Sequence, residues 1–173
     1  MPWRPARWQL APAPTDPINS YRTAGTVQIA LPMVAPNTSQ RPTVLVIDDE
    51  STVRWVIRRA LEPDVCNVIE SADGVSGILR VSRGTPQVDL VIVDLKLPNL
   101  NGLEVIESLS RSHPGLPMLC ITGFGATATG LLESALRDYH VPVILKPFKG
   151  EELADAVRGL LERASRRTAH TAK

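Results

Sequence analysis

The segment Val-Asp-Leu-Val-Ile-Val-Asp, residues 88–94, is a short run of leucine and β-branched residues that ends in an aspartate. Runs of this composition are typical of strands buried on both faces, as in a parallel sheet. Four similar runs stand elsewhere in the chain, and amphipathic stretches separate them, which predicts repeated βα units. We therefore expect an α/β fold with a five-stranded parallel sheet, its strands at residues 44–47, 65–69, 88–93, 118–121 and 143–145.

The stretches between these runs carry the spacing of amphipathic helices. Apolar residues recur at helical intervals over 53–61, and Pro63 ends this helix. A second clear stripe covers 153–161, after two glutamates that favour a helix N-terminus. We expect helices on both faces of a doubly wound, flavodoxin-like sheet with the strand order 2-1-3-4-5. Three further helices are predicted near residues 74–83, 103–111 and 127–138.

The ends of the chain differ in composition from its centre. Residues 1–42 hold eight of the 15 prolines, which predicts a disordered or loosely docked arm, with a strand at 26–31 as the alternative. We expect the folded domain at 43–163 and a basic tail at 164–173. Residues 43–162 carry 11 Lys and Arg against 17 Asp and Glu. This acidic body favours a cation or a basic partner over nucleic acid.

Composition also excludes several classes of protein. The two cysteines, Cys66 and Cys120, lie in apolar segments and are interpreted as small buried hydrophobes. Two cysteines give neither a metal-ligand spacing nor a disulfide framework. No signal-peptide core is present, and no segment approaches the roughly 18 apolar residues of a membrane span. We therefore expect a cytoplasmic protein without membrane contact.

The carboxyl ends of the predicted strands carry the polar residues of this sequence. The first strand ends in Asp48-Asp49-Glu50, the third in Asp94, the fourth in Thr122 and the fifth in Lys146-Pro147. In a parallel sheet these ends meet at one edge, where ligands bind. Clustered carboxylates repel one another and favour a hard divalent cation such as Mg²⁺. Together with a lysine and a hydroxyl, they are suited to phosphoryl transfer onto a carboxylate.

Four segments resemble the signatures of the response regulator receiver family: VLVIDDE, VDLVIVDLKLPNLNG, MLCITGFG and VILKPF. The resemblance covers residues 43–163 and implies that Asp94 is the phospho-acceptor. It implies an Mg²⁺ ion held by Asp48, Asp49, Asp94 and the backbone carbonyl of Lys96. It also implies that Thr122 and Lys146 contact the phosphoryl group and that the Lys146-Pro147 peptide is cis.

The same resemblance implies partners and a switch. A histidine kinase or phosphotransfer protein would donate the phosphoryl group, and a downstream protein would read the face formed by 127–138, the strand at 143–145 and the last helix. Homodimer formation is a further partner hypothesis. Receivers usually carry Tyr or Phe three residues before the lysine, where this chain has Val143, so the usual switch with Thr122 is in question. Tyr139 stands four residues earlier, in the predicted turn.

The leading hypothesis is a stand-alone receiver, which is not an enzyme beyond its own phosphorylation and dephosphorylation. One alternative is a receiver piece of a larger DNA-binding regulator or hybrid kinase. Another is an Mg²⁺-dependent phosphatase of the haloacid dehalogenase type, although Lys96 stands where such enzymes need a second aspartate. A degenerate receiver that binds a partner without phosphorylation is the last alternative.

Overall fold

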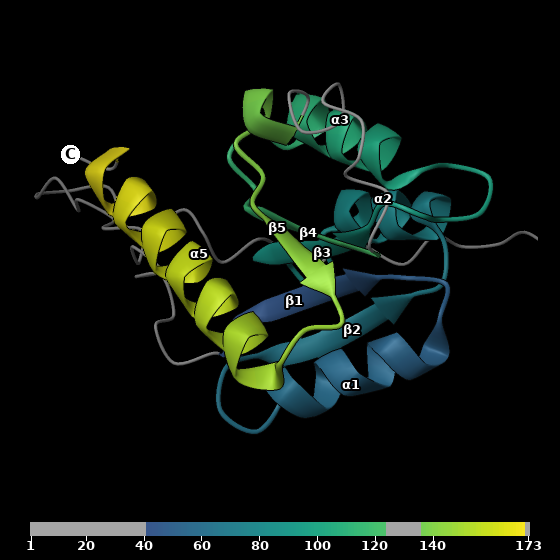
Figure 1. Ribbon diagram of the computed structural model, residues 1–173. Helices are drawn as coiled ribbons and strands as arrows, with labels where there is room; N and C mark the ends of the chain where they lie inside the picture. The colour runs from purple at the N-terminus through teal and green to yellow at the C-terminus, as the bar shows by residue number, and fades with distance from the viewer. Residues whose placement is uncertain (1–40, 124–135, 172–173) are drawn as a thin grey trace, which may run out of the picture. The chain divides into compact units, whose positions relative to one another are not determined.

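The protein is seen in a computed structural model that describes residues 41–123 and 136–171, all within one compact unit, Ser39–Lys173. Five parallel strands form one sheet in the order β2-β1-β3-β4-β5 (Figure 1). The predicted fold class and strand order are confirmed. The strands are β1 (Thr43–Ile47), β2 (Asn67–Ser71), β3 (Leu90–Asp94), β4 (Met118–Gly123) and β5 (Val143–Lys146).

Two strands begin later than the sequence pattern predicts. Val65 and Cys66 lie outside β2 because their amides donate to the carbonyl oxygen of Leu61, which closes the helix before them. Val88 and Asp89 precede β3, and the Asp89 carboxylate accepts a hydrogen bond from the Thr43 amide at 2.8 Å. The first two residues of each apolar run therefore belong to the connection before the strand, and each strand begins two residues later than predicted.

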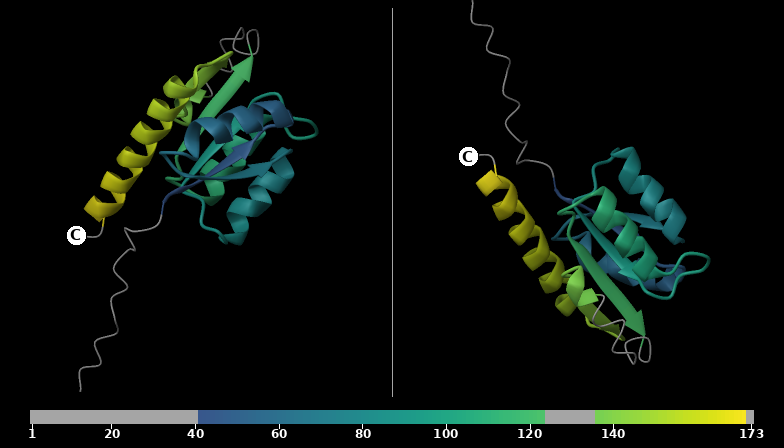
Figure 2. Two further views of the ribbon diagram at one scale, coloured as in Figure 1. Left: turned by 90° about the horizontal axis from the view of Figure 1, so that it is seen from below. Right: turned by 90° about the horizontal axis from the view of Figure 1, so that it is seen from above.

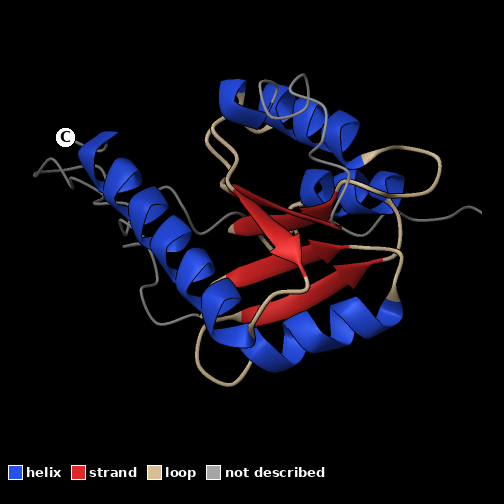
Figure 3. Ribbon diagram, viewed as in Figure 1, coloured by secondary structure: helices blue, strands red, loops and turns tan. Residues whose placement is uncertain are grey.

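The helices with both ends in the described residues are α1 (Ser51–Leu61), α2 (Gly74–Arg83), α3 (Gly102–Ser112) and α5 (Gly150–Thr171) (Figure 3). The side chain of Asp73 caps α2, and Asn101 forms a capping box with Glu104 at the start of α3. Helix α5 continues past residue 163, where the basic tail was predicted to begin. Of the helix predicted near 127–138, only residues 136–138 are described, and they are helical. The predicted arm, with its alternative strand at 26–31, lies outside the described residues except for residues 41 and 42.

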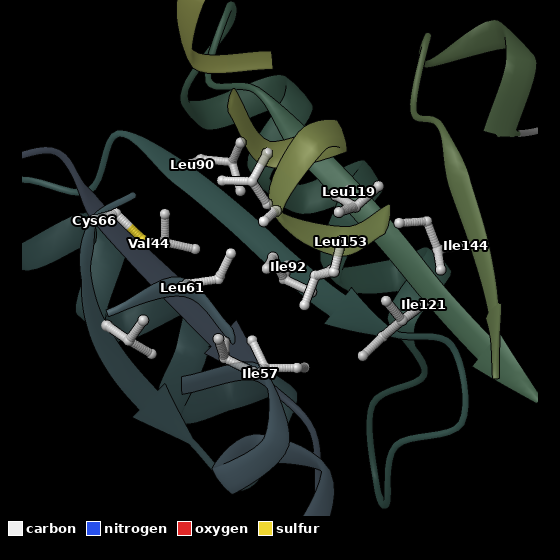
Figure 4. Packing of buried hydrophobic residues seen from close by; sticks show 14 residues of the cluster. Val44, Ile57, Leu61, Cys66, Leu90, Ile92, Leu119, Ile121, Ile144 and Leu153 are labelled. Carbon is white, nitrogen blue, oxygen red and sulfur yellow. The ribbon is translucent and has the colours of Figure 1, made fainter. Parts of the chain in front are cut away.

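The helices lie in two layers, with α1 and α5 on one face of the sheet and α2 and α3 on the other (Figure 2). Each face has its own buried apolar cluster. On the α1 and α5 face, side chains such as Ile57, Ile92 and Leu153 pack together (Figure 4). Strand residues point alternately into the two clusters, so that the sheet is fixed from both sides. This rigid sheet fixes the positions of the strand ends, where polar residues gather.

No helix in the described ranges, 41–123 and 136–171, is both long enough and apolar enough to cross a membrane.

Candidate acidic site at the strand ends

The structure brings three of the predicted site residues into direct contact. Asp48 follows β1, Asp94 ends β3 and Lys146 ends β5. The Lys146 ammonium donates to Asp48 Oδ2 at 2.8 Å and to Asp94 Oδ2 at 2.7 Å. Both carboxylates are buried, with relative exposures of 0% and 3%. Residues that are far apart in the chain thus form one charged cluster.

Burial and charge act in opposite directions in this cluster. Burial raises the pKa of Asp48, and the hydrogen bond from Lys146 offsets only part of that effect. Burial alone would lower the pKa of Lys146, but its hydrogen bonds to Asp48 and Asp94 outweigh it and raise the pKa. The ammonium therefore stays protonated at neutral pH, and the site carries two buried carboxyl groups against one lysine.

Oxygen donors suited to a divalent cation also meet here. Carboxylate oxygens of Asp48, Glu50 and Asp94 lie within 4.8 Å of one another. Hard cations such as Mg²⁺ prefer oxygen ligands of this kind, so the donor set fits the ion that the sequence predicts. Asp49, a predicted metal ligand, is exposed and does not belong to this group. Its role in metal binding stays a prediction.

Glu50 stands among the acids at the end of the first predicted strand, but it was not among the predicted metal ligands. Its backbone amide donates to Asp48 Oδ1 at 2.8 Å, which closes a tight turn directly after β1. This turn brings the Glu50 carboxylate to 3.6 Å from the Lys146 ammonium, although its side chain stays 63% exposed. The signal was present in the sequence, because Glu50 is the third acid in a row after the strand.

Thr122 is fully buried on β4, and its hydroxyl has no hydrogen-bond partner among the described residues. A buried hydroxyl without a partner is rare and calls for an explanation. A phosphoryl oxygen would supply an acceptor for it. Beside it, a Cβ built on Gly123 would meet no atom of the described residues within 4 Å.

The loop after β3 holds Asp94 from its backbone. The Lys96 amide donates to Asp94 Oδ1 at 3.1 Å, and the Gly102 amide donates to the Leu95 carbonyl at 3.0 Å. Gly102 approaches so closely that a Cβ there would overlap the carbonyl group of Asp94. The loop therefore packs directly against the backbone of Asp94. The predicted metal contact from the Lys96 carbonyl stays a prediction.

The end of β5 contains one confirmed and one unusual feature. The Lys146-Pro147 peptide is cis, as the sequence resemblance implied. Val143, in place of the usual aromatic residue, starts β5 opposite Cys120 and is 37% exposed. Tyr139 is partly buried against the cluster on the α2 and α3 face. Neither the aliphatic Val143 nor Tyr139 has a hydrogen bond to Thr122 among the described residues.

Comparisons with known proteins agree with this geometry. A family model for the response regulator receiver domain matches residues 44–158. The chain is 36% identical over 126 residues to a Mycobacterium tuberculosis protein named "Probable transcriptional regulatory protein TcrX", covering 72% of this chain and 51% of the relative. It is 29% identical over 129 residues to the sensor kinase CckA of Brucella abortus, covering 75% of this chain and 13% of the kinase.

Among solved structures, the fold matches a response regulator receiver domain protein from Clostridium thermocellum. The TM-score is 0.65 at 27% identity, over 72% of this chain and 97% of that one. The chain spans about half the length of the first curated relatives it matches.

Proposed function

The chain belongs to the response regulator receiver domain family, and from that premise we propose that it accepts a phosphoryl group on Asp94 from a histidine kinase or phosphotransfer protein. The observation that carries this proposal is the contact of one ammonium, Lys146, with both Asp48 and Asp94. Such an arrangement holds an anionic acceptor next to a permanent positive charge. The sensor kinase CckA contains a region similar to this chain, which agrees with a kinase as the signalling partner.

In the proposed reaction, a carboxylate oxygen of Asp94 forms a bond to phosphorus while the bond from phosphorus to the donor breaks and the donor keeps that electron pair. Asp48, Glu50 and Asp94 would hold Mg²⁺, with Asp49 and the Lys96 carbonyl as the further predicted ligands. The ion would neutralise charge on the transferred group. Lys146 would pair with a phosphoryl oxygen after transfer, and the Thr122 hydroxyl would donate to another.

The signal would then pass to a downstream protein through a change in the populations of two conformations. We propose that the responsive face is formed by residues 127–138, β5 and α5. Because Val143 lacks an aromatic ring, the response at Thr122 would not include the inward ring movement usual in the family. The cytoplasmic location expected from the sequence stays a prediction and belongs to this proposal.

A direct test is incubation with Mg²⁺ and acetyl phosphate, followed by intact-protein mass spectrometry. We expect a gain of one phosphoryl group that a chelator abolishes and that Asp94→Asn does not show. Asp89→Asn is a matched control, since Asp89 precedes the same strand but contacts the Thr43 amide instead of the site. A gain that persists in Asp94→Asn would show that another residue is the acceptor. Absence of any gain in the wild type would favour the degenerate receiver.

A second candidate function is favoured by the coverage of the relatives. The protein named as a transcriptional regulatory protein is about twice as long as the matched region, and CckA is longer still. Under this alternative, the receiver controls a DNA-binding or kinase module within one polypeptide, with dimerisation as one route of control. Measuring DNA affinity and its salt dependence separates the two, because sequence-selective binding by this chain would contradict relay through protein contacts alone.

The phosphatase alternative makes a different prediction. A haloacid dehalogenase enzyme would turn over phosphate esters through a short-lived aspartyl phosphate, whereas a receiver modifies only itself. Lys96 occupies the position where such a phosphatase needs a second aspartate, and the matching family model is that of a receiver. Steady-state hydrolysis of a simple phosphate ester would restore this alternative.

A further inference from the structure

Arg54 connects the acidic loop after β1 to the neighbouring strand β2. It lies in α1, and its side chain is only 15% exposed. One end group, Nη1, donates to the carbonyl oxygens of Asp48 at 2.8 Å and Asp49 at 3.1 Å. The Nε group donates to Glu70 Oε2 at 3.0 Å. A single guanidinium therefore binds two successive peptide groups and one carboxylate.

We propose that Arg54 is a positioning residue that holds the Asp48-Asp49 loop in the conformation needed to bind Mg²⁺. The inference rests on the proposed function, because it concerns the metal site used for phosphorylation of Asp94. Arg54 touches neither the phospho-acceptor nor the Lys146 ammonium in the described contacts. Its effect passes through the backbone of the loop.

The loop needs such a restraint because it brings like charges together. Asp48, Asp49 and Glu50 follow one another in the chain, and carboxylate oxygens of Asp48, Glu50 and Asp94 lie within 4.8 Å of one another. Repulsion between carboxylates favours conformations in which they move apart. Fixing the carbonyl groups of Asp48 and Asp49 restricts the backbone rotations by which the loop would open. Residues behind a metal's own ligands commonly set its affinity in this way.

The chemistry of arginine suits this task. Its planar fork presents donors in fixed directions, and here it reaches carbonyl oxygens on one side and a carboxylate on the other. A lysine ammonium at the same position is a point charge on a flexible stem and cannot reproduce all three contacts. Glu70 in turn fixes the Arg54 side chain, because its other oxygen accepts from Arg58 Nε at 2.7 Å. The guanidinium is thereby held before any ion arrives.

Arg58 offers a matched control within the same helix. It shares the Glu70 partner and adds an ion pair with Glu62 at 2.9 Å, but among the described interactions it has no hydrogen bond or ion pair with the acidic loop. Both arginines therefore stabilise the α1 and β2 connection, whereas only Arg54 reaches the carbonyl groups of Asp48 and Asp49. Comparison of the two separates loop positioning from general stability.

The test compares wild type, Arg54→Lys, Arg54→Gln and Arg58→Gln by calorimetric titration with Mg²⁺. A second arm follows hydrogen exchange of the Asp49 and Glu50 amides in metal-free protein. We expect both Arg54 variants to bind Mg²⁺ about tenfold more weakly and to exchange these amides faster, whereas Arg58→Gln stays within about twofold of wild type. Phosphorylation by acetyl phosphate should need more Mg²⁺ in the Arg54 variants, but should approach the wild-type rate at saturating Mg²⁺.

Three outcomes would overturn the inference, and they can be told apart. If wild type binds Mg²⁺ and folded Arg54→Lys binds it equally well, the positioning role is wrong while the proposed function stands. If wild type itself binds no Mg²⁺ and gains no phosphoryl group, the proposed function fails together with the inference. Equal losses of affinity in Arg54→Gln and Arg58→Gln would also refute it, because they would reduce the effect to general stability. Should Arg54→Gln not fold, the comparison of Arg54→Lys with Arg58→Gln decides.

Discussion

Replacing Lys146 by methionine tests the electrostatics of the site most directly. The substitution keeps most of the aliphatic volume but removes the ammonium that binds both Asp48 and Asp94. The side chains of these two carboxylates are 0% and 5% exposed, so water cannot readily replace the lost charge. In metal-free protein, the buried carboxylates of Asp48 and Asp94 therefore lose the ammonium that compensates their charge.

The magnitude follows from this burial. Removing one partner of a buried ion pair costs about 3–5 kcal/mol, because the other charge stays desolvated. Since the Lys146 side chain is 17% exposed, water already reaches the ammonium and the lower end applies. We expect a loss of about 3 kcal/mol in the free energy of unfolding, which for a domain of this size lowers Tm by roughly 10 °C.

The same substitution should increase the response to Mg²⁺. Lys146 binds the carboxylates that are expected to hold the ion, so its charge opposes metal binding. Two unit charges about 4 Å apart interact by roughly 1 kcal/mol in water and more strongly inside a protein, and a divalent ion doubles the effect. We expect Mg²⁺ to bind at least about tenfold more tightly to Lys146→Met than to wild type, which corresponds to about 1.4 kcal/mol. Mass action then makes the Mg²⁺-induced stabilisation of the variant correspondingly larger.

Thermal unfolding in chelator and in saturating Mg²⁺ measures both effects. Arg158→Met is the control, because its ion pair with Asp155 lies on the surface with side chains 48% and 74% exposed. Such a change should stay within about 0.5 kcal/mol of wild type under both conditions. The reasoning is refuted if Lys146→Met matches wild type in chelator, or if Mg²⁺ raises Tm by the same amount in both proteins.

Three further predictions concern residues around the site. Burial alone would raise the pKa of Glu70, but hydrogen bonds from its two arginine partners lower it. The stabilisation that Glu70→Gln removes should therefore be fully present above about pH 4.3 and should disappear as the pH falls through the lowered folded-state pKa. Urea unfolding of both proteins at several pH values checks this sign. Gly102→Ala should destabilise the fold by about 1–3 kcal/mol and slow phosphorylation, since the new Cβ displaces the carbonyl group of Asp94, and retention of both wild-type stability and rate would contradict this. Burial raises the pKa of Cys66 to about 11 and that of Cys120 to about 12, so a thiol reagent at pH 8 should label the native protein far more slowly than the unfolded chain.

The sheet could be predicted from the sequence because its strands are buried on both faces. A strand such as β3 must be apolar at almost every position, so it stands in the sequence as a short uninterrupted apolar run that is easily recognised. The convergence of Asp48, Asp94 and Lys146 could be predicted for the same reason. Once the strands are parallel and ordered, their carboxyl ends share one edge, and each polar residue there has a known neighbour.

The rest depended on side-chain directions and long-range contacts that periodicity does not encode. A run of three acids does not say which side chain turns toward the ion, and here the hydrogen bond from the Glu50 amide to Asp48 decides it. The role of Arg54 was equally hidden, because an arginine on a helix normally indicates a solvent-exposed face. Its ion pair exists only because β2 places Glu70 beside α1, and its hydrogen bonds to the carbonyl groups of Asp48 and Asp49 depend on the turn before the helix. The turn after Leu61 shortened β2 through backbone hydrogen bonds that no residue type signals.

Two features of the site that contains Asp94 lower the stability of the fold. The Thr122 hydroxyl is buried without a partner among the described residues, and burial raises the pKa of the Asp48 carboxyl. An unsatisfied buried polar group costs about 1–3 kcal/mol, and locally unfavourable choices of this kind concentrate at functional sites. A phosphoryl group would give the hydroxyl its acceptor, and a cation would compensate the carboxylates, so binding at Asp94 relieves both costs at once. Val143 has no polar group that could bind either the phosphoryl group or the cation. We therefore expect the free energy that drives any conformational response to arise at Thr122, at Lys146 at the end of β5 and in the acidic loop.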